Sequence, residues 1–179
     1  MSVAFPESIE TERLRFRPPM PQDAETIFAA YAQDLEVCRF MVWTPHSSVE
    51  ITSQFIRRCV GSWHAETAFP YVLALRDNDA VVGMLEVRPT ANRANIGYVL
   101  AKAYWGRGLM AEAIRAFATL AFSDLSFFRV EATCDVENRA SARVLEKSGF
   151  VREGRLARYT VHPNIAAEPR DCWMYATSR

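Results

Sequence analysis

The side chains of this sequence that could carry chemistry include four cysteines and three histidines, none of which lies in a metal-binding motif. The cysteines are far apart, with no CxxC pair and no histidine at zinc-finger spacing. We therefore expect no metal and interpret them as buried thiols in a reducing cytoplasm: Cys38, Cys59, Cys134 and Cys172. His64 and His162 stand alone in the sequence, and no role is predicted for either.

The clearest chemical signal is a pair of glycines, Gly106 and Gly108, between a strand-like run and a helix-like run. Glycine tolerates positive φ and lets a ligand approach the main chain closely. The amides at the start of a helix lack partners within the helix and attract anions. Residues 105–110 are therefore predicted to form a phosphate-binding turn.

Two other interpretations of this turn are weaker. Residues 106–111 formally match the dinucleotide-binding pattern GxGxxG/A, with Glu131 where a ribose-binding acid would lie. That pattern belongs after the first strand of a repeated βαβ series, whereas this turn lies mid-chain. A Walker A loop is excluded because no Gly-Lys-Ser/Thr occurs. Taken alone, the two glycines could also simply begin a helix.

Hydrophobic periodicity predicts the elements around the turn. Strands over 71–75, 80–87 and 94–101 are joined by short turns and must be antiparallel neighbours. A helix over 107–122 and a strand over 128–134 then make one βαβ-like crossover. The other expected elements are a strand over 12–17, a helix over 23–32, an irregular segment over 35–48, a helix that begins with Ser47 and Glu50 as a capping box, a helix over 138–147 closed by Gly149, and strands over 151–161 and 172–176. We expect one α+β domain over 9–179, with a mixed, mostly antiparallel central sheet flanked by helices.

Composition excludes several classes of protein. Lys+Arg and Asp+Glu both number 21, so nothing indicates general affinity for nucleic acid or for an anionic membrane. The first ten residues lack the basic and apolar regions of a signal peptide, and no run is long enough to predict a membrane helix. We expect a cytoplasmic protein whose anion site is local.

A second motif, further along the chain, indicates the function of the glycine turn. The segment N-x-x-S-x-x-x-L-E-K-x-G-F runs from Asn138 to Phe150 and follows the strand–WGxG–helix segment. Together they resemble the GNAT superfamily of acyl-CoA-dependent N-acetyltransferases. The opening E-T-E-R-L-R-F-R-P-P and the Tyr159 and Pro169–Asp171 regions are most similar to the ribosomal-protein N-terminal acetyltransferase group. The resemblance implies the GNAT fold and an acetyl-CoA-dependent enzyme.

The resemblance also implies a site for acetyl-CoA. The pantetheine arm would lie along the strand before the turn, where an amide near Leu100 would hydrogen-bond the thioester carbonyl. The pyrophosphate would lie on the amides of the turn, with Arg107 adding charge. Asn138 would contact the cofactor as well as cap its helix. The implied acetyl-CoA-binding residues are Val99, Leu100, Ala101, Trp105, Gly106, Arg107, Gly108, Leu109, Met110, Asn138 and Ser141.

The usual acid and base of the family are missing. Many members carry Glu where this chain has Asn95, and Tyr where it has Leu145. By resemblance Ser141 becomes the candidate acid for the departing thiolate, although a serine in a helix often bonds its own backbone. Tyr159 is the second candidate acid, and Glu86 is the candidate base because period-two counting puts it on one face with Met84 and Arg88.

The acceptor site is expected from the irregular segment and the last loop, with Trp43, His46, Glu86 and Tyr159 as substrate-binding candidates. The expected acceptor is a primary amine, a protein N-terminus above all, attacked directly in a ternary complex. A small amine or an antibiotic on the same fold remains an alternative, as does a non-catalytic CoA-binding module. A homodimer is possible.

Overall fold

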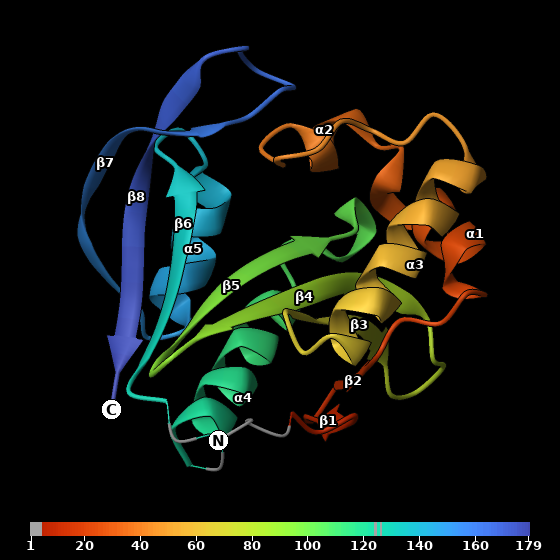
Figure 1. The fold of residues 1–179 in the computed structure, drawn as a ribbon, viewed down its shortest axis with the longest axis horizontal. Helices are drawn as coiled ribbons and strands as arrows, with labels where there is room; N and C mark the ends of the chain where they lie inside the picture. The colour runs from red at the N-terminus through yellow and green to blue at the C-terminus, as the bar shows by residue number, and fades with distance from the viewer. Residues whose placement is uncertain (1–4, 124, 126) are drawn as a thin grey trace.

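A mixed β-sheet organises the chain in the computed structural model, which describes residues 5–123, 125 and 127–179. The strands are β1 (Ile9–Glu10), β2 (Leu14–Arg17), β3 (Phe69–Leu75), β4 (Val81–Thr90), β5 (Arg93–Leu100), β6 (Arg129–Asp135), β7 (Val151–Val161) and β8 (Pro169–Ser178). The helices are α1 (Asp23–Ile27), η1 (Phe28–Ala32), α2 (Leu35–Cys38), α3 (Val49–His64), η2 (Lys102–Tyr104), α4 (Leu109–Ser123) and α5 (Arg139–Lys147). The strand order is β1-β2-β3-β4-β5-β6-β8-β7, as Figure 1 shows.

The predicted α+β architecture is confirmed. Strands β3, β4 and β5 form the expected antiparallel meander, and β5 pairs with β6 in parallel across α4. The other neighbouring strands pair antiparallel. Gly149 ends α5 with φ +86°, as its position after the helix predicts. In the described part of the chain, no helix is long and apolar enough to cross a membrane.

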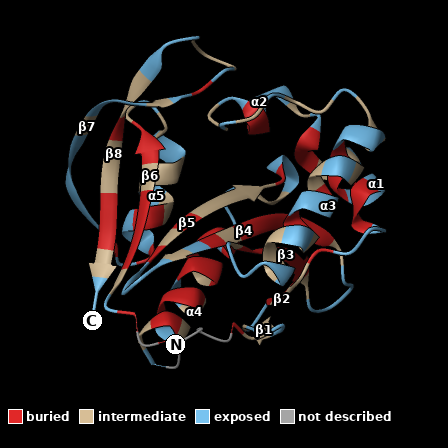
Figure 2. Cartoon of the chain, in the orientation of Figure 1, coloured by how far each residue is buried: buried red, intermediate tan, exposed pale blue. Residues whose placement is uncertain are grey.

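Helices cover both faces of the sheet, and Figure 2 marks the buried residues between the layers. On one face Ile114 and Phe117 of α4 belong to the same hydrophobic cluster as Leu85 of β4, and all three side chains are completely buried. On the other face Ile56 of α3 packs in a cluster that contains Met84. Adjacent residues of β4 thus point to opposite faces, as the period-two counting predicts.

The helix expected over 23–32 needs correction. The helix expected over 23–32 is α-helical only to Ile27 and continues as the π-helical turn η1. The last carbonyls of η1 bind groups outside the helix, because Ala32 accepts from the His46 amide at 2.8 Å and Tyr31 from the Cys38 thiol at 3.8 Å. These contacts draw the turn away from regular α-helical bonding.

The capping box predicted at Ser47 is also wrong by one residue. Ser48 is the N-cap of α3, with extended backbone angles and no side-chain capping hydrogen bond. The segment before it is not wholly irregular either, since Asp34 caps the short helix α2 by accepting from the amides of Glu36 and Val37. Helix α4 begins at Leu109 rather than Arg107, because Gly106 and Gly108 both have positive φ.

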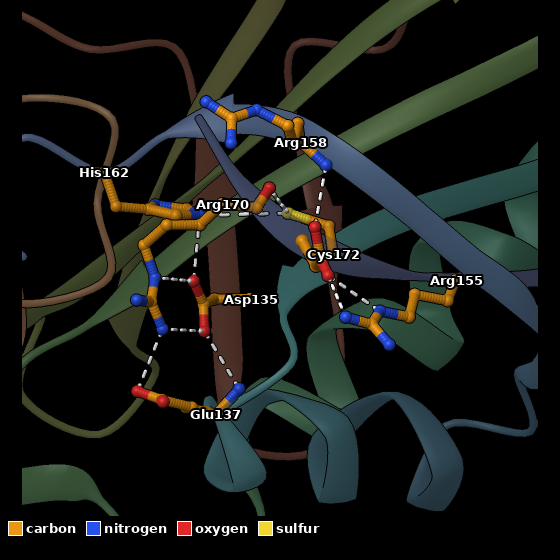
Figure 3. A network of polar contacts seen from close by, with 8 residues as sticks. Asp135, Glu137, Arg155, Arg158, His162, Arg170 and Cys172 are labelled. Carbon is orange, nitrogen blue, oxygen red and sulfur yellow. Dashed lines mark hydrogen bonds and ion pairs between the residues drawn. The ribbon is translucent and has the colours of Figure 1, made fainter. Parts of the chain in front are cut away.

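A buried carboxylate ties the end of β6 to β8 (Figure 3). Asp135 accepts hydrogen bonds from Arg170 Nε at 2.6 Å and from the Glu137 amide at 2.9 Å, and its side chain is fully buried. Burial opposes its ionisation, but the hydrogen bonds from Arg170 and Glu137 outweigh that effect and lower the pKa of Asp135. His162 Nε2 lies 3.8 Å from the same carboxylate.

The close approach of β4 to β5 predicts that Gly83→Ala destabilises the sheet. A Cβ atom at this position would lie 2.2 Å from the carbonyl oxygen of Val99, so the two strands must separate. We expect a loss of about 1–3 kcal/mol in the free energy of unfolding, measured by urea denaturation. Gly61→Ala is the control, because nothing lies within 4 Å of its Cβ position on α3, and it should gain ~0.5–1 kcal/mol. An unchanged midpoint for Gly83→Ala would contradict the packing argument.

The buried ion pair predicts that Asp135→Asn lowers stability by roughly 3 kcal/mol at neutral pH, because Arg170 loses its buried partner. The pKa of Asp135 is lower in the folded than in the unfolded state. The contribution of the Asp135 charge to the free energy of unfolding is therefore fully present above ~3.9, which is its pKa in the unfolded state. This contribution is lost as the pH falls through the lower pKa of the folded state. Thermal unfolding of the wild type and of Asp135→Asn over this pH range should show that their stabilities converge in acid. Glu168→Gln, which removes an exposed ion pair with Arg158, should cost less than ~1 kcal/mol throughout.

Candidate active site

Strands β5 and β6 separate after a short region of pairing. Their register covers Arg93–Asn95 opposite Arg129–Glu131, yet β5 continues to Leu100 and β6 to Asp135. Figure 1 shows the two strands lying together at one end and diverging toward the other. The result is a wedge-shaped gap in the middle of the sheet.

The backbone of β5 presents hydrogen-bonding groups to this gap. The Ala101 amide donates to the Val82 carbonyl at 2.8 Å, which fixes the phase of the β4–β5 ladder. Backbone groups in an antiparallel pair alternate between the two sides of a strand. The amides of residues 97 and 99 therefore turn toward β4, and those of Tyr98 and Leu100 turn toward the gap.

A cavity of about 550 Å³ opens at the gap and extends toward the first half of the chain. Its walls contain side chains from both halves of the sheet and from the segment between α2 and α3. Seven of the predicted site residues line it: Trp43, His46, Glu86, Val99, Asn138, Ser141 and Tyr159. The remaining predicted residues are not part of its lining. They lie at the end of β5, in the turn after it and at the start of α4: Leu100, Ala101 and 105–110.

The glycine turn is held in place from a distant strand. Gly106 and Gly108 have φ of +75° and +76°, conformations that side chains with a Cβ adopt at a cost. Arg13 donates from Nη1 to the Arg107 carbonyl at 2.9 Å and pairs with Glu112 in the first turn of α4. Burial opposes the ionisation of Glu112, but the hydrogen bonds from Thr11 and Arg13 prevail and lower its pKa. This pairing occupies the carboxylate in the first turn of α4, next to the predicted anion site.

The side chains of the turn differ in what they can contribute. Trp105 is 46% exposed and donates from Nε1 to the Leu100 carbonyl at 2.7 Å, so it links the turn to the end of β5. The guanidinium of Arg107 lies 5.3 Å from the centre of the Tyr104 ring. Leu109 and Met110 are buried, so their side chains anchor α4 and only their amides can face a ligand.

Ser141 is hydrogen-bonded to a partner that the sequence analysis missed. Its Oγ lies 2.7 Å from the hydroxyl of Tyr98 on β5. Burial raises the pKa of Tyr98, so the phenol stays protonated and can act as a donor. Asn138 accepts from the Ser141 amide at 3.1 Å and caps α5. Period-two counting along β5, to find the side chains on the face toward α5, could have predicted Tyr98 as the partner of Ser141.

Glu86 is paired with Arg88, which lies on the same face of β4. Arg88 donates from Nη1 to its carboxylate at 2.9 Å and from Nη2 to Asn95 Oδ1 at 2.7 Å. The guanidinium also lies over Gly97, where a Cβ would be 3.1 Å from Nη2. Asn95, at the position where many GNAT enzymes carry Glu, thus orients the arginine that holds Glu86.

The wall formed by the first half of the chain contains packed aromatic rings. Trp43 and His46 lie 5.2 Å apart between ring centres, and His46 Nδ1 lies 2.8 Å from Thr52 Oγ1. Burial, with a contribution from Arg58, lowers the pKa of His46. Asn164, between β7 and β8, donates its two amide hydrogens to the carbonyls of Cys38 and Trp43 at 2.6 and 2.9 Å.

Two further residues of the cavity, Tyr159 and Cys134, differ in exposure. Tyr159 lies where the β7–β8 register shifts, next to Arg158 with φ +47°, and is 54% exposed at the rim. Cys134 is buried, and burial raises the pKa of its thiol to about 11 despite an interaction with Ser141. Cys134 is therefore a protonated lining residue at neutral pH.

Comparison with known proteins agrees with this geometry. Residues 13–151 match the family model described as an acetyltransferase (GNAT) domain. The N-acetyltransferase YoaA of Bacillus subtilis is 32% identical over 154 residues, which cover 84% of this chain and 86% of YoaA.

Solved structures show the same fold. A GNAT-family acetyltransferase from Bacillus anthracis superposes with a TM-score of 0.84 at 27% identity, covering 96% of this chain and 98% of its own. RimL, a ribosomal L7/L12 α-N-protein acetyltransferase solved in complex with coenzyme A, has a TM-score of 0.84 at 21% identity. The superposition covers 96% of this chain and 98% of RimL. The strand gap, the glycine turn and the matched domain lead to one conclusion: this chain belongs to the GNAT family and is an N-acetyltransferase.

Proposed function

We propose that this enzyme transfers the acetyl group of acetyl-CoA to the α-amino group of a polypeptide, by direct attack in a ternary complex. The observation that carries the proposal is the gap between β5 and β6, because it opens into the cavity lined by Glu86, Ser141 and Tyr159. A thioester bound in the gap would therefore meet an amine that enters from the cavity. The four described cysteines are free and buried, which supports action in a reducing cytoplasm.

Acetyl-CoA would bind as an additional strand along β5. The amides that face the gap are free to pair with the pantetheine arm, in the way that an extended peptide adds to a sheet edge. The pyrophosphate would lie on the amides from Trp105 to Met110, where the positive φ of two glycines exposes the main chain. The Cβ position of Gly106 has nothing within 4 Å, so the turn has room for a ligand.

The reaction needs a donor for the oxygen and a proton for the sulfur. As the amine attacks, negative charge grows on the thioester oxygen, and the Leu100 amide is the donor that would stabilise it. One fixed donor of this kind is worth ~3–4 kcal/mol of the barrier. Ser141 would protonate the departing thiolate and regain its proton from the hydroxyl of Tyr98, 2.7 Å away. Much of the remaining acceleration comes from holding two substrates in line.

The choice of a polypeptide acceptor rests on the shape of the cavity and on similarity. Tyr159 is exposed at the rim, while Trp43 and His46 form an inner wall, so an extended chain end can enter amine first. Glu86 would attract the ammonium form of that amine through its carboxylate. RimL, which shares the fold, acts on the α-amino group of a ribosomal protein. A peptide α-amine with a pKa near ~8 is partly neutral at cellular pH.

A panel of acceptors tests this function. We expect release of CoA thiol from acetyl-CoA with short peptides that carry a free N-terminus, and no release with the same peptides blocked by acetylation. Lysine, spermidine and an aminoglycoside supply the small-amine arm. Faster turnover of a small amine than of every peptide would contradict the acceptor class, and acetyl-CoA binding without any turnover would contradict the function.

Ser141→Ala tests the proposed acid. We expect kcat to fall ~100-fold, the usual contribution of a positioned proton donor, with the acetyl-CoA KM little changed. Tyr98→Phe should slow the reaction less, because it removes the donor to Ser141 and keeps the serine. Ser123→Ala is the matched control, since this exposed hydroxyl bonds the Thr119 carbonyl on α4. A Ser141→Ala enzyme at full rate would remove Ser141 from the mechanism.

A further inference from the structure

Two buried polar atoms lack a hydrogen-bond partner among the described residues. They are the hydroxyl of Tyr31 and Nδ1 of His162, and both side chains line the active-site cavity. A buried polar atom without a partner costs about 1–3 kcal/mol, so such atoms are rare in native proteins and call for an explanation. A ligand that enters the cavity would supply the missing partner.

His162 has the surroundings of a base as well as an unused nitrogen. Its side chain is 6% exposed, and Nε2 faces the Asp135 carboxylate at 3.8 Å and the Cys172 sulfur at 3.9 Å (Figure 3). Asp135 carries its charge in this position, because Arg170 holds it ionised. A carboxylate beside Nε2 favours the tautomer with hydrogen on Nε2, which leaves Nδ1 with a lone pair.

The location of His162 fits a role in the acetyl transfer. Asp135 directly follows Cys134, which lines the cavity on the β6 side of the gap. Tyr159 and Thr160 precede His162 in the chain and line the same cavity. The imidazole therefore belongs to the wall at the ends of β6 and β7, and Asn164, two residues further along the chain, contacts the Trp43 carbonyl. His162 itself is among the residues that line the cavity, so its ring borders the space that an acceptor would enter.

We propose that Nδ1 of His162 contacts the amino group of the acceptor and removes its proton, with Asp135 as the positioning residue behind it. This inference rests on the proposed function. The acceptor R–NH3⁺ gives one proton to Nδ1, and the free amine forms a C–N bond to the thioester carbon. The C–S bond then breaks, the thiolate takes the Ser141 proton, Ser141 regains one from Tyr98, and the second proton lost by the nitrogen restores the Tyr98 hydroxyl. The imidazolium finally releases its proton to water, so charge and atoms balance.

The charged groups around the imidazole support this step. Asp135 on β6 stabilises the imidazolium, while Arg170 on β8 is shared between Asp135 and Glu137. Cys172 on β8 is buried, and burial raises the pKa of its thiol, so it adds no charge. A base oriented by a third group is the general arrangement of an activated proton acceptor.

The test measures CoA thiol release by the full-length enzyme with the best peptide of the panel. His162→Asn and His162→Ala should lower kcat at least ~100-fold, while the dissociation constant for acetyl-CoA changes less than ~3-fold. Added imidazole should restore part of the rate of His162→Ala and none of that of His162→Asn. His64→Gln is the control, because His64 is an exposed residue of α3, and it should keep the wild-type rate.

Each outcome of this test either supports or contradicts the assignment of His162 as the base. If the wild type turns over and the His162 variants keep half its rate or more, His162 is not the base and the proposed function stands. If the wild type binds acetyl-CoA but acetylates no amine of the panel, the proposed function and this inference fall together. If the variants do not fold, imidazole nitrogen NMR of the wild type replaces them: addition of the peptide with CoA must shift the Nδ1 signal of His162, and an unchanged signal overturns the proposal.

Discussion

The separation of β5 from β6 is the constraint on which the rest of the site depends. Two parallel strands normally continue to pair, and an unpaired edge inside a sheet leaves amides and carbonyls without partners. Here the pairing ends at Asn95 and Glu131 because the two strands belong to diverging halves of the sheet. The freed edge of β5 is the reason that a thioester can bind in the centre of a folded domain.

Distant contacts keep that edge in position. Gly83 lets β4 approach the Val99 carbonyl, so β5 is held by its other neighbour along its whole length. Arg13 reaches from beside β2 to the glycine turn and to Glu112, and Trp105 returns from the turn to the last carbonyl of β5. The strand, the turn and the first turn of α4 therefore behave as one rigid element, as a catalytic donor such as the Leu100 amide requires.

Local sequence signals predicted the helices and strands, whereas several side-chain contacts in the site join residues that are far apart in the sequence. The meander, the crossover, the glycine turn and the cap at Asn138 follow from periodicity and residue type over a few neighbours. The pairing of Glu86 with Arg88 follows from period-two counting, whereas the contact of Arg88 with Asn95 across two strands does not. Nor does the contact of Tyr98 on β5 with Ser141 on α5. His162 was without an assigned role because nothing in the linear sequence connects it to Asp135.

The side chain of Asn164 has a consequence for how fast the enzyme can work. It joins the loop after β7 to the segment after α2 through hydrogen bonds to the Cys38 and Trp43 carbonyls, and these two segments come from opposite halves of the sheet. A neutral hydrogen bond is worth only about 0.5–1.5 kcal/mol net, so this closure opens and reforms readily. The acetylated product and the next acceptor would exchange through this opening, and because it opens readily it would leave bond formation as the step that sets kcat.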